Sequence, residues 1–253
     1  MKKSIGIIPA RYASTRFPGK PLVDIAGKSM IQRVYEQVSQ SNLDKVVVAT
    51  DDARIYKAVQ GFGGTVVMTG KHENGTARCI EAFLKETESY DILVNIQGDE
   101  PFIAPEQINA ALTAFAIPDT QIATLTKQIH RLEDLLNPNV VKVVFSNAIA
   151  PNIYNALYFS RSPIPFVRDL PQQAWLTQEH FDKHSGLDAF SRSFLVETYP
   201  PLVAGKLEDI EKLEQLSWLE QNLSIRILKT TYETPNIDTP EDLEKALRWF
   251  KNT

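Results

Sequence analysis

A polar segment near the N-terminus, residues 10–21 (ARYASTRFPGKP), combines positive charge with small side chains. Arg11, Arg16 and Lys20 place three cations within ten residues, and a small residue such as Ser14 lets backbone N–H groups approach an anion. A triphosphate requires distributed cations together with backbone donors, and this segment offers both. We interpret it as a candidate polyphosphate-binding loop, while charge and position alone fit a solvated basic loop equally well.

Two carboxylates, Asp99 and Asp238, are candidate metal ligands. Asp99 stands in the segment 95–101 (NIQGDEP), directly after an apolar run. Mg²⁺ bound to a nucleotide takes one or two protein carboxylates in addition to phosphate oxygens, so an acid at the end of a strand is suited to hold it. Asp238 stands in a strand-to-helix turn, 235–240 (PNIDTP), where a helix-capping role is the simpler interpretation.

The segment 72–78 (HENGTAR) is polar and opens a predicted helix. Gly75 and Thr76 could present backbone groups to the edge of a base, with Arg78 one turn further along. An ordinary helix N-terminus explains the segment almost as well. The four histidines of the chain lack the spacing of zinc ligands, so the sequence does not favour a metal site built on histidine.

Apolar runs alternate with amphipathic segments through the first half of the chain. The predicted strands cover residues 5–10, 46–49, 65–68, 92–96 and 122–126. The predicted helices cover residues 29–39, 52–59, 76–84 and 105–115. This alternation predicts an α/β fold, with a parallel sheet and helices on both of its faces. Arg11 and Asp99 both follow strands, so we expect them at the carboxyl edge of the sheet, where open α/β sheets bind ligands.

The pattern then changes. The runs 140–145 and 156–160 have no clear helix between them and predict an antiparallel pair. The proline-containing segment 163–183 is interpreted as an irregular loop or dimerisation arm. Further elements are a helix over 207–219, a strand over 225–228 and a helix that begins at Thr239–Pro240, a capping residue followed by proline.

Composition narrows the class of protein. The 253 residues are 43% hydrophobic and carry a formal net charge of −4, which disfavours general nucleic-acid binding. The single cysteine, Cys79, excludes a disulfide within the chain and favours a reducing compartment. No apolar run approaches the length of a membrane span, so we expect a soluble cytoplasmic protein.

Two glycine-containing segments imitate nucleotide-binding motifs. Gly27-Lys28-Ser29 lacks the first glycine of a P-loop, and residues 61–64 precede a strand, so neither is a nucleotide-binding fingerprint.

Taken together, these segments resemble the CMP-Kdo synthetases, which are 3-deoxy-manno-octulosonate (Kdo) cytidylyltransferases. The resemblance extends over nearly the whole chain, in the correct order. It rests on the blocks 8–22 (IPARYASTRFPGKPL), 46–51 (VVVATD), 95–101 (NIQGDEP), 137–144 (NPNVVKVV), 156–161 (ALYFSR), 213–216 (LEQL) and 238–243 (DTPEDL). The first and third blocks are highly specific together, whereas either alone indicates only a sugar nucleotidyltransferase.

The resemblance implies a Rossmann-like nucleotidyltransferase with a mostly parallel sheet. Residues 1–253 would form a single nucleotidyltransferase domain, with 130–205 as a sugar-binding and dimerisation subregion of a homodimer. The reaction would convert CTP and Kdo to CMP-Kdo and pyrophosphate, for lipopolysaccharide biosynthesis. No nucleic-acid or membrane partner is implied.

The resemblance also implies roles for particular residues. The triphosphate-binding positions match Arg11, Ser14, Arg16 and Lys20. The cytosine-binding positions match Asn74, Gly75, Thr76 and Arg78. The Mg²⁺-binding positions match Asp99 and Asp238, and these act with Arg16 and Lys20 in catalysis. The positions that line the sugar pocket match Gln97, Arg161, His184 and Gln215, and Asp188, which departs from the family, is the further predicted sugar-binding residue.

Three positions depart from the family pattern. Ala77 stands where an acid is usual beside the base, Asp188 where a tyrosine is usual, and Ser217 where an arginine is usual. A gained acid and a lost base near the sugar could favour an amino group, so a modified Kdo, such as an 8-amino form, is one hypothesis and neutral drift is the other. Alternative functions are CMP activation of a different acidic sugar or of a phosphonate, and a catalytically silent nucleotide-binding homologue.

Overall fold

The computed structural model describes residues 2–13, 17–72, 74–178, 180–200, 202–232, 237 and 239–251. The chain forms two compact units. The first unit comprises Met1–Asn109 and Glu233–Thr253, and the second comprises Ala110–Tyr232. The subregion 130–205 expected from the sequence lies inside the second unit.

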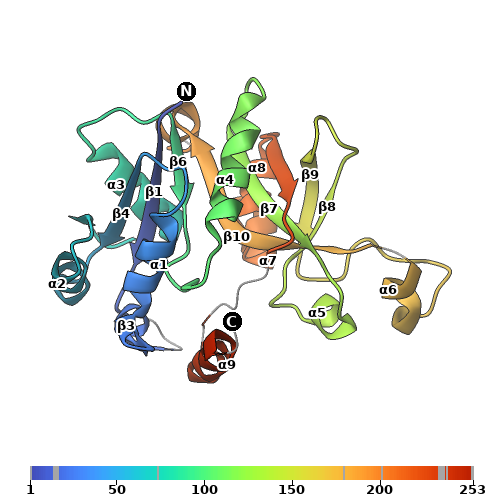
Figure 1. Ribbon diagram of the computed structural model, residues 1–253. Coiled ribbons are helices and arrows are strands. Elements are labelled where there is room, and N and C mark those ends of the chain that lie inside the picture. The colour runs from blue at the N-terminus through green and yellow to red at the C-terminus, as the bar shows by residue number, and fades with distance from the viewer. Residues whose placement is uncertain are drawn as a thin grey trace. The chain divides into compact units, whose positions relative to one another are not determined.

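The first unit contains a parallel sheet with the strand order β5-β4-β1-β6 (Figure 1). Its strands are β1 (Ser4–Ala10), β4 (Lys45–Thr50), β5 (Val66–Met68) and β6 (Ile92–Asn95). The central strand β1 is buried along almost its whole length, because helices cover both faces of the sheet. The order confirms the parallel sheet that the alternating sequence pattern predicts.

Helices flank this sheet in the first unit (Figure 1). They are α1 (Met30–Val38), α2 (Ala53–Gly61), α3 (Gly75–Leu84) and α9 (Pro240–Lys251), with α4 (Pro105–Thr113) leading into the second unit. The loop after β1 contains a 3₁₀ turn, η1 (Lys20–Leu22), and a small hairpin, β2 (Asp24–Ile25) and β3 (Lys28–Ser29). The C-terminal helix α9 docks through Ala246 onto a small core that also contains Ile25, Met30, Phe102 and Ile237. The segment after residue 236 therefore returns to the N-terminal half of the chain.

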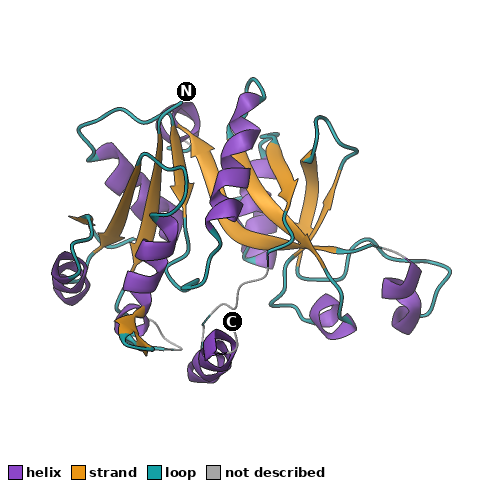
Figure 2. Ribbon diagram, in the orientation of Figure 1, coloured by secondary structure: helices purple, strands orange, loops and turns teal. Residues whose placement is uncertain are grey.

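The second unit contains a mixed sheet with the order β10-β7-β11-β9-β8. Its strands are β7 (Ile122–Gln128), β8 (Lys142–Phe145), β9 (Ile153–Ser160), β10 (Asp182–Ser191) and β11 (Ile225–Lys229). Only β7 and β11 pair in parallel, while the other pairings among these strands are antiparallel. The start of β10 also pairs with β8, so these strands curl until the sheet closes on itself at that end (Figure 2).

Short helices connect the strands of the second unit. They are α5 (Leu132–Leu136), α6 (Trp175–Gln178), α7 (Lys206–Glu211) and α8 (Glu214–Glu220), with the 3₁₀ turns η2 (Ala114–Ala116) and η3 (Gln172–Ala174) and the π-helical turn η4 (Phe194–Thr198). No helix in the described ranges is long and apolar enough to cross a membrane.

Two sequence predictions need correction in this unit, and one strand was missed. The single helix predicted over 207–219 is two helices, because Lys212 adopts a left-handed conformation with φ 54° and ends α7. The segment predicted as irregular over 163–183 contains α6 and the first residues of β10. Strand β10 itself was not predicted, because its sequence DKHSGLDAFS mixes polar residues with a glycine and lacks strict alternation. The antiparallel pair predicted over 140–145 and 156–160 is confirmed as β8 and β9.

Candidate active site

Parallel strands bring the two most informative sequence segments to one edge of the first sheet. Strands β1 and β6 are neighbours, and residues 11 and 97–99 directly follow their carboxyl ends. Gly98 permits this close approach, because a Cβ atom on it would lie 2.9 Å from the backbone oxygen of Pro9. Asp99 is therefore held beside the loop that follows β1.

Lys20 and Asp99 form a direct ion pair. Lys20 Nζ lies 2.7 Å from Asp99 Oδ2, and the two side chains are only 13% and 27% exposed. The turn that carries Lys20 depends on Gly19, whose φ of 73° suits glycine, and whose N–H donates to the Tyr12 carbonyl at 2.9 Å. A cation from the candidate phosphate-binding loop thus meets the candidate metal ligand, although 79 residues separate them.

The rest of the predicted phosphate-binding loop is described only in part. Arg11 is exposed at the end of β1. Ser14 and Arg16 lie outside the described residues. Between them, Tyr12 carries the guanidinium of Arg54 stacked on its ring, 3.3 Å from the ring centroid. Arg54 was not singled out from the sequence, and it adds a cation next to this loop.

The second predicted metal ligand, Asp238, also lies outside the described residues, but its neighbour Ile237 is described. Ile237 is buried, and its N–H donates to the backbone oxygen of Asp99 at 3.1 Å. The helix cap of α9 is built by Thr239 and Asp242, since Thr239 Oγ1 accepts from the Asp242 N–H at 3.2 Å and Asp242 Oδ2 accepts from the Thr239 N–H at 3.1 Å. The capping role that the sequence favoured for Asp238 is thus filled by other residues.

Glu100, the residue after Asp99, is almost completely buried. Burial, together with the neighbouring Asp99 carboxylate, raises the pKa of Glu100 to about 8. At neutral pH Glu100 is therefore largely protonated and adds no second full charge beside Asp99. Sequence reasoning missed this residue, because its burial depends on the packing of the loop that follows β6.

Arg78 holds the candidate base-binding segment, residues 72–78, in place through side-chain contacts. This buried guanidinium pairs with Asp51 Oδ2 at 3.2 Å and donates to Thr69 Oγ1 at 2.6 Å, so it ties α3 to the ends of neighbouring strands. Asn74 caps α3 by accepting from the Ala77 N–H at 2.8 Å. Gly75 lies against Pro9, and Thr76 is buried. The structure thus gives Asn74 and Arg78 structural contacts at the start of α3.

Glu81 is the first acid on α3 after Ala77. It lies one turn further along α3, contacts His72 Nε2 and accepts from the Gly70 N–H at 2.9 Å. Contacts with Lys85, His72 and the Gly70 N–H lower the pKa of Glu81 to about 2. A carboxylate therefore still holds the loop that precedes the candidate base-binding segment.

In the second unit, three of the predicted sugar-binding residues lie together. His184 Nε2 lies 3.6 Å from Asp188 Oδ1, and Gln215 Nε2 donates to Asp188 Oδ2 at 3.4 Å. The side chains of all three residues are almost fully buried. The His184 ring also packs edge-on against the Phe159 ring, with 5.3 Å between the ring centroids. We call His184, Asp188 and Gln215 the sugar-site cluster.

Arg161, a further predicted sugar-binding residue, has other partners. Its side chain donates to the carbonyls of Glu211 at 2.5 Å, Pro138 at 3.0 Å and Lys212 at 3.3 Å. The contacts with Glu211 and Lys212 satisfy carbonyls that are freed where α7 ends, so Arg161 stabilises the helix break at Lys212. Gln97, the remaining predicted sugar-binding residue, belongs to the first unit, where its carbonyl accepts from the Glu100 N–H at 3.4 Å.

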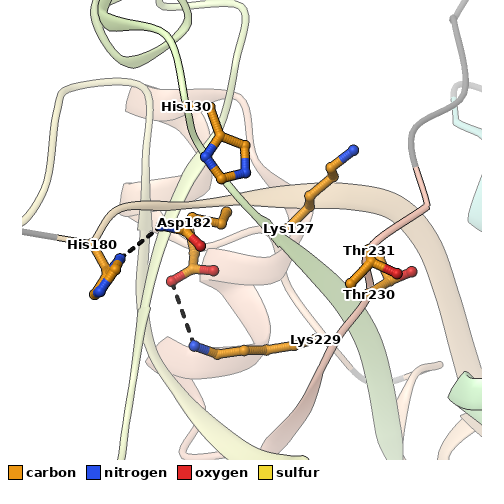
Figure 3. Close-up of a pocket in the computed structure, with 8 residues that line it drawn as sticks. Lys127, His130, His180, Asp182, Lys229, Thr230 and Thr231 are labelled. Atoms are coloured by element: carbon orange, nitrogen blue, oxygen red, sulfur yellow. Dashed lines mark hydrogen bonds and ion pairs between the residues drawn. The ribbon is translucent and has the colours of Figure 1, made fainter. Parts of the chain in front are cut away.

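The second unit also contains a polar cavity of about 310 Å³ (Figure 3). It lies where β7 and β11 end and is lined by Lys127, Gln128, His130, His180, Asp182, Lys229, Thr230 and Thr231. Lys229 extends toward Asp182, with 4.0 Å between Nζ and Oδ2, and burial raises the pKa of Asp182. Sequence reasoning missed this cavity, although polar residues at the ends of two strands were a usable signal.

Among the described residues, no group of three or more His, Cys, Asp or Glu side chains is arranged to hold a metal ion.

Comparison with known proteins defines the class. A family model described as cytidylyltransferase matches residues 5–227. A structure of CMP:2-keto-3-deoxy-manno-octonic acid synthetase complexed with CTP is 40% identical, covers 99% of both chains and superposes with a TM-score of 0.89. The fold and the family match are thus those of an α/β nucleotidyltransferase of the cytidylyltransferase class.

Curated relatives narrow the assignment. A 3-deoxy-manno-octulosonate cytidylyltransferase from Parabacteroides distasonis is 54% identical over the full length of both chains. Another, from Phocaeicola vulgatus, is 51% identical and the match covers 98% of each chain. The chain belongs to the 3-deoxy-manno-octulosonate cytidylyltransferase family, which confirms the resemblance read from the sequence.

Proposed function

We propose that this protein transfers the CMP unit of CTP to Kdo, releasing pyrophosphate and supplying CMP-Kdo for lipopolysaccharide biosynthesis. The observation that carries the proposal is the ion pair between Lys20 and Asp99 at the carboxyl edge of the parallel sheet. It joins a cation suited to a polyphosphate and a carboxylate suited to a metal in one place. The family relationship supplies the identity of the two substrates.

The reaction is an in-line displacement at phosphorus. The anomeric hydroxyl oxygen of the sugar attacks the α-phosphorus of CTP and loses its proton to solvent water, the bond from the α-phosphorus to the bridging oxygen breaks, and pyrophosphate leaves with that electron pair. Such transfer needs positioning and charge neutralisation more than covalent help from the protein. Lys20 would stabilise the negative charge that builds up on pyrophosphate, and Arg16 would share this role.

The donor set at this edge fits Mg²⁺. Asp99 offers a partly exposed carboxylate, a hard oxygen ligand, and Glu100 stays protonated beside it. Asp99 and Asp238 would hold the metal, and Ile237 attaches the chain next to Asp238 directly to Asp99. When bound, Mg²⁺ supplies positive charge that polarises the α-phosphate and lowers the pKa of the attacking hydroxyl.

We further propose a cytoplasmic homodimer that associates through residues 130–205. In support, this region exposes large apolar side chains: Phe166 is 74% exposed and Leu157 is 60% exposed. An interface that covers these side chains would remove their apolar surface from water. Light scattering should give twice the monomer mass for the wild type and a smaller mass for Phe166→Ser combined with Leu157→Ser.

The direct test is product formation. The purified protein is incubated with CTP, Mg²⁺ and Kdo, pyrophosphate release is followed, and the nucleotide product is identified by mass. We expect CMP-Kdo and equimolar pyrophosphate, and none without Mg²⁺. Binding of CTP without Mg²⁺-dependent turnover of any keto-acid sugar would instead support a silent nucleotide-binding homologue.

A further inference from the structure

Asp188 is a buried acid on an irregular part of β10. The pairing of β10 with β7 jumps between Ser185 and Asp188, so Gly186 and Leu187 bulge out of the ladder. Bulges re-aim the side chains beside them. The Asp188 side chain is only 9% exposed, and its Oδ1 atom has no hydrogen-bond partner among the described residues. Because a buried carboxylate oxygen without a donor costs free energy, this atom requires an explanation.

His184 lies beside this oxygen but does not satisfy it. Its Nε2 atom is 3.6 Å from Asp188 Oδ1 and only 2.8 Å from Thr124 Oγ1. The Thr124 hydroxyl donates its single proton to the Leu187 carbonyl at 2.7 Å, so Thr124 Oγ1 must accept from His184 Nε2–H. The Nε2 proton is therefore committed to Thr124, and Asp188 Oδ1 stays without a donor.

The other neighbours supply no matching positive charge. Gln215 reaches Asp188 Oδ2 with a neutral amide, at a long 3.4 Å. Of the Lys, Arg and His side chains within the described ranges, only His184 lies within 4.0 Å of the Asp188 carboxylate. Ser217, two residues beyond Gln215 on α8, donates to Glu208 and accepts from the Gly205 N–H, so this position brings no cation either.

We propose that Asp188 is a specificity-determining residue that binds a protonated amino group of the acceptor, so that the preferred substrate is a 3-deoxy keto-acid sugar in which a primary ammonium replaces one hydroxyl. The inference rests on the proposed cytidylyl transfer and on the sugar-site cluster facing the acceptor. An ammonium supplies both the missing donor and the opposite charge, whereas a hydroxyl supplies a donor only. The carboxylate of the sugar acid is repelled by Asp188 and must bind away from it.

The test is a comparison of acceptors. With CTP and Mg²⁺ near pH 7, where an alkyl ammonium is protonated, kcat/KM is measured for Kdo and for analogues in which one hydroxyl at a time, beginning with the terminal one, is replaced by a primary amine. We expect the wild type to prefer one amino analogue by at least about tenfold, the scale of one charge-assisted hydrogen bond over a neutral one. Asp188→Asn keeps the size and removes the charge, so this preference should fall by about tenfold or more. Asp182→Asn, a second buried acid on β10, is the matched control and should keep the preference.

The outcomes separate the two proposals. A wild-type preference for Kdo over every amino analogue overturns the role of Asp188 and leaves cytidylyl transfer standing. A preference for an amino analogue that is unchanged in Asp188→Asn also overturns the role of Asp188 and leaves cytidylyl transfer standing. The wild-type comparison decides by itself if Asp188→Asn does not fold. Turnover of none of these sugars, with CTP bound, overturns the proposed function and this inference with it.

Discussion

The two units differ in how they treat charge at the residues assigned to substrates. In the first unit, two of the described cations near strand ends have internal partners: Lys20 pairs with Asp99, and Arg78 pairs with Asp51. In the second unit, the Asp188 carboxylate keeps an unpartnered oxygen among the described residues. A ligand that binds Lys20 or Asp99 must therefore compete with an internal ion pair. A ligand that binds Asp188 can instead supply the hydrogen-bond donor that Oδ1 lacks. The first arrangement suits a highly charged nucleotide with its metal, and the second suits selection between similar sugars.

The largest expected effect concerns Asp99. Asp99→Asn keeps the size of the side chain but removes the charge that would hold Mg²⁺, so turnover should fall by at least about 100-fold, the scale of one key electrostatic group. Steady-state kinetics at saturating CTP measures the loss, and far-ultraviolet circular dichroism confirms the fold. Glu106→Gln, an exposed acid on the neighbouring helix α4, is the control and should turn over normally. Near-normal turnover of Asp99→Asn would remove this residue from the mechanism.

A second experiment tests the contrast itself by comparing stability. Arg78→Met breaks a paired, buried group and leaves Asp51 without its cation, so the free energy of unfolding should fall by about 3 kcal/mol. Asp188→Asn removes the charge of a buried carboxylate that has one oxygen without a hydrogen-bond donor, and it should leave the free energy of unfolding unchanged or raise it. Urea denaturation without ligands measures both. Equal destabilisation by the two substitutions would show that the two units do not differ in this way.

A third experiment uses the raised pKa of Glu100. The pKa of Glu100 is about 8 in the folded protein, whereas the ordinary value, taken for the unfolded chain, is 4.5. Between these pH values the folded state therefore binds more protons than the unfolded state. Stability should therefore fall as pH rises through this interval, with this residue contributing up to about 1.4 kcal/mol per pH unit. Glu100→Gln removes the contribution, so its stability relative to wild type should improve from pH 5 to pH 8. Parallel stability curves for the two proteins would contradict the assigned pKa.

The smallest effect is expected at Ser217. Its hydroxyl links the Gly205 N–H to Glu208 and so ties α8 to the start of α7. Ser217→Ala should lower the free energy of unfolding by about 1 kcal/mol, the typical value of one hydrogen bond, and leave the acceptor preference intact. Thermal or urea denaturation checks the first expectation, and the acceptor comparison checks the second. A changed preference would place Ser217 in sugar selection with Asp188.

The sequence by itself determined the elements that local signals define. The parallel strands are continuous apolar runs, and α9 begins at Pro240 directly after its capping residue Thr239, as predicted. The motif positions, read with the family resemblance, identified the cytidylyltransferase family that the comparisons confirm. The assigned roles of the site residues, the bound Mg²⁺ and the homodimer stay predictions, and Ser14, Arg16 and Asp238 lie outside the described residues.

Only the tertiary structure decided which of these groups meet. Lys20 reaches Asp99 across 79 residues because β1 and β6 are neighbours, and strand order is not written in any local pattern. The break at Lys212 depends on Arg161, which satisfies carbonyls that an uninterrupted helix would have bonded internally. Strand β10 exists because β7 supplies its hydrogen bonds, and the bulge in that pairing gives Asp188 its environment. Each of these depends on long-range packing, which overrides local propensity where the two disagree.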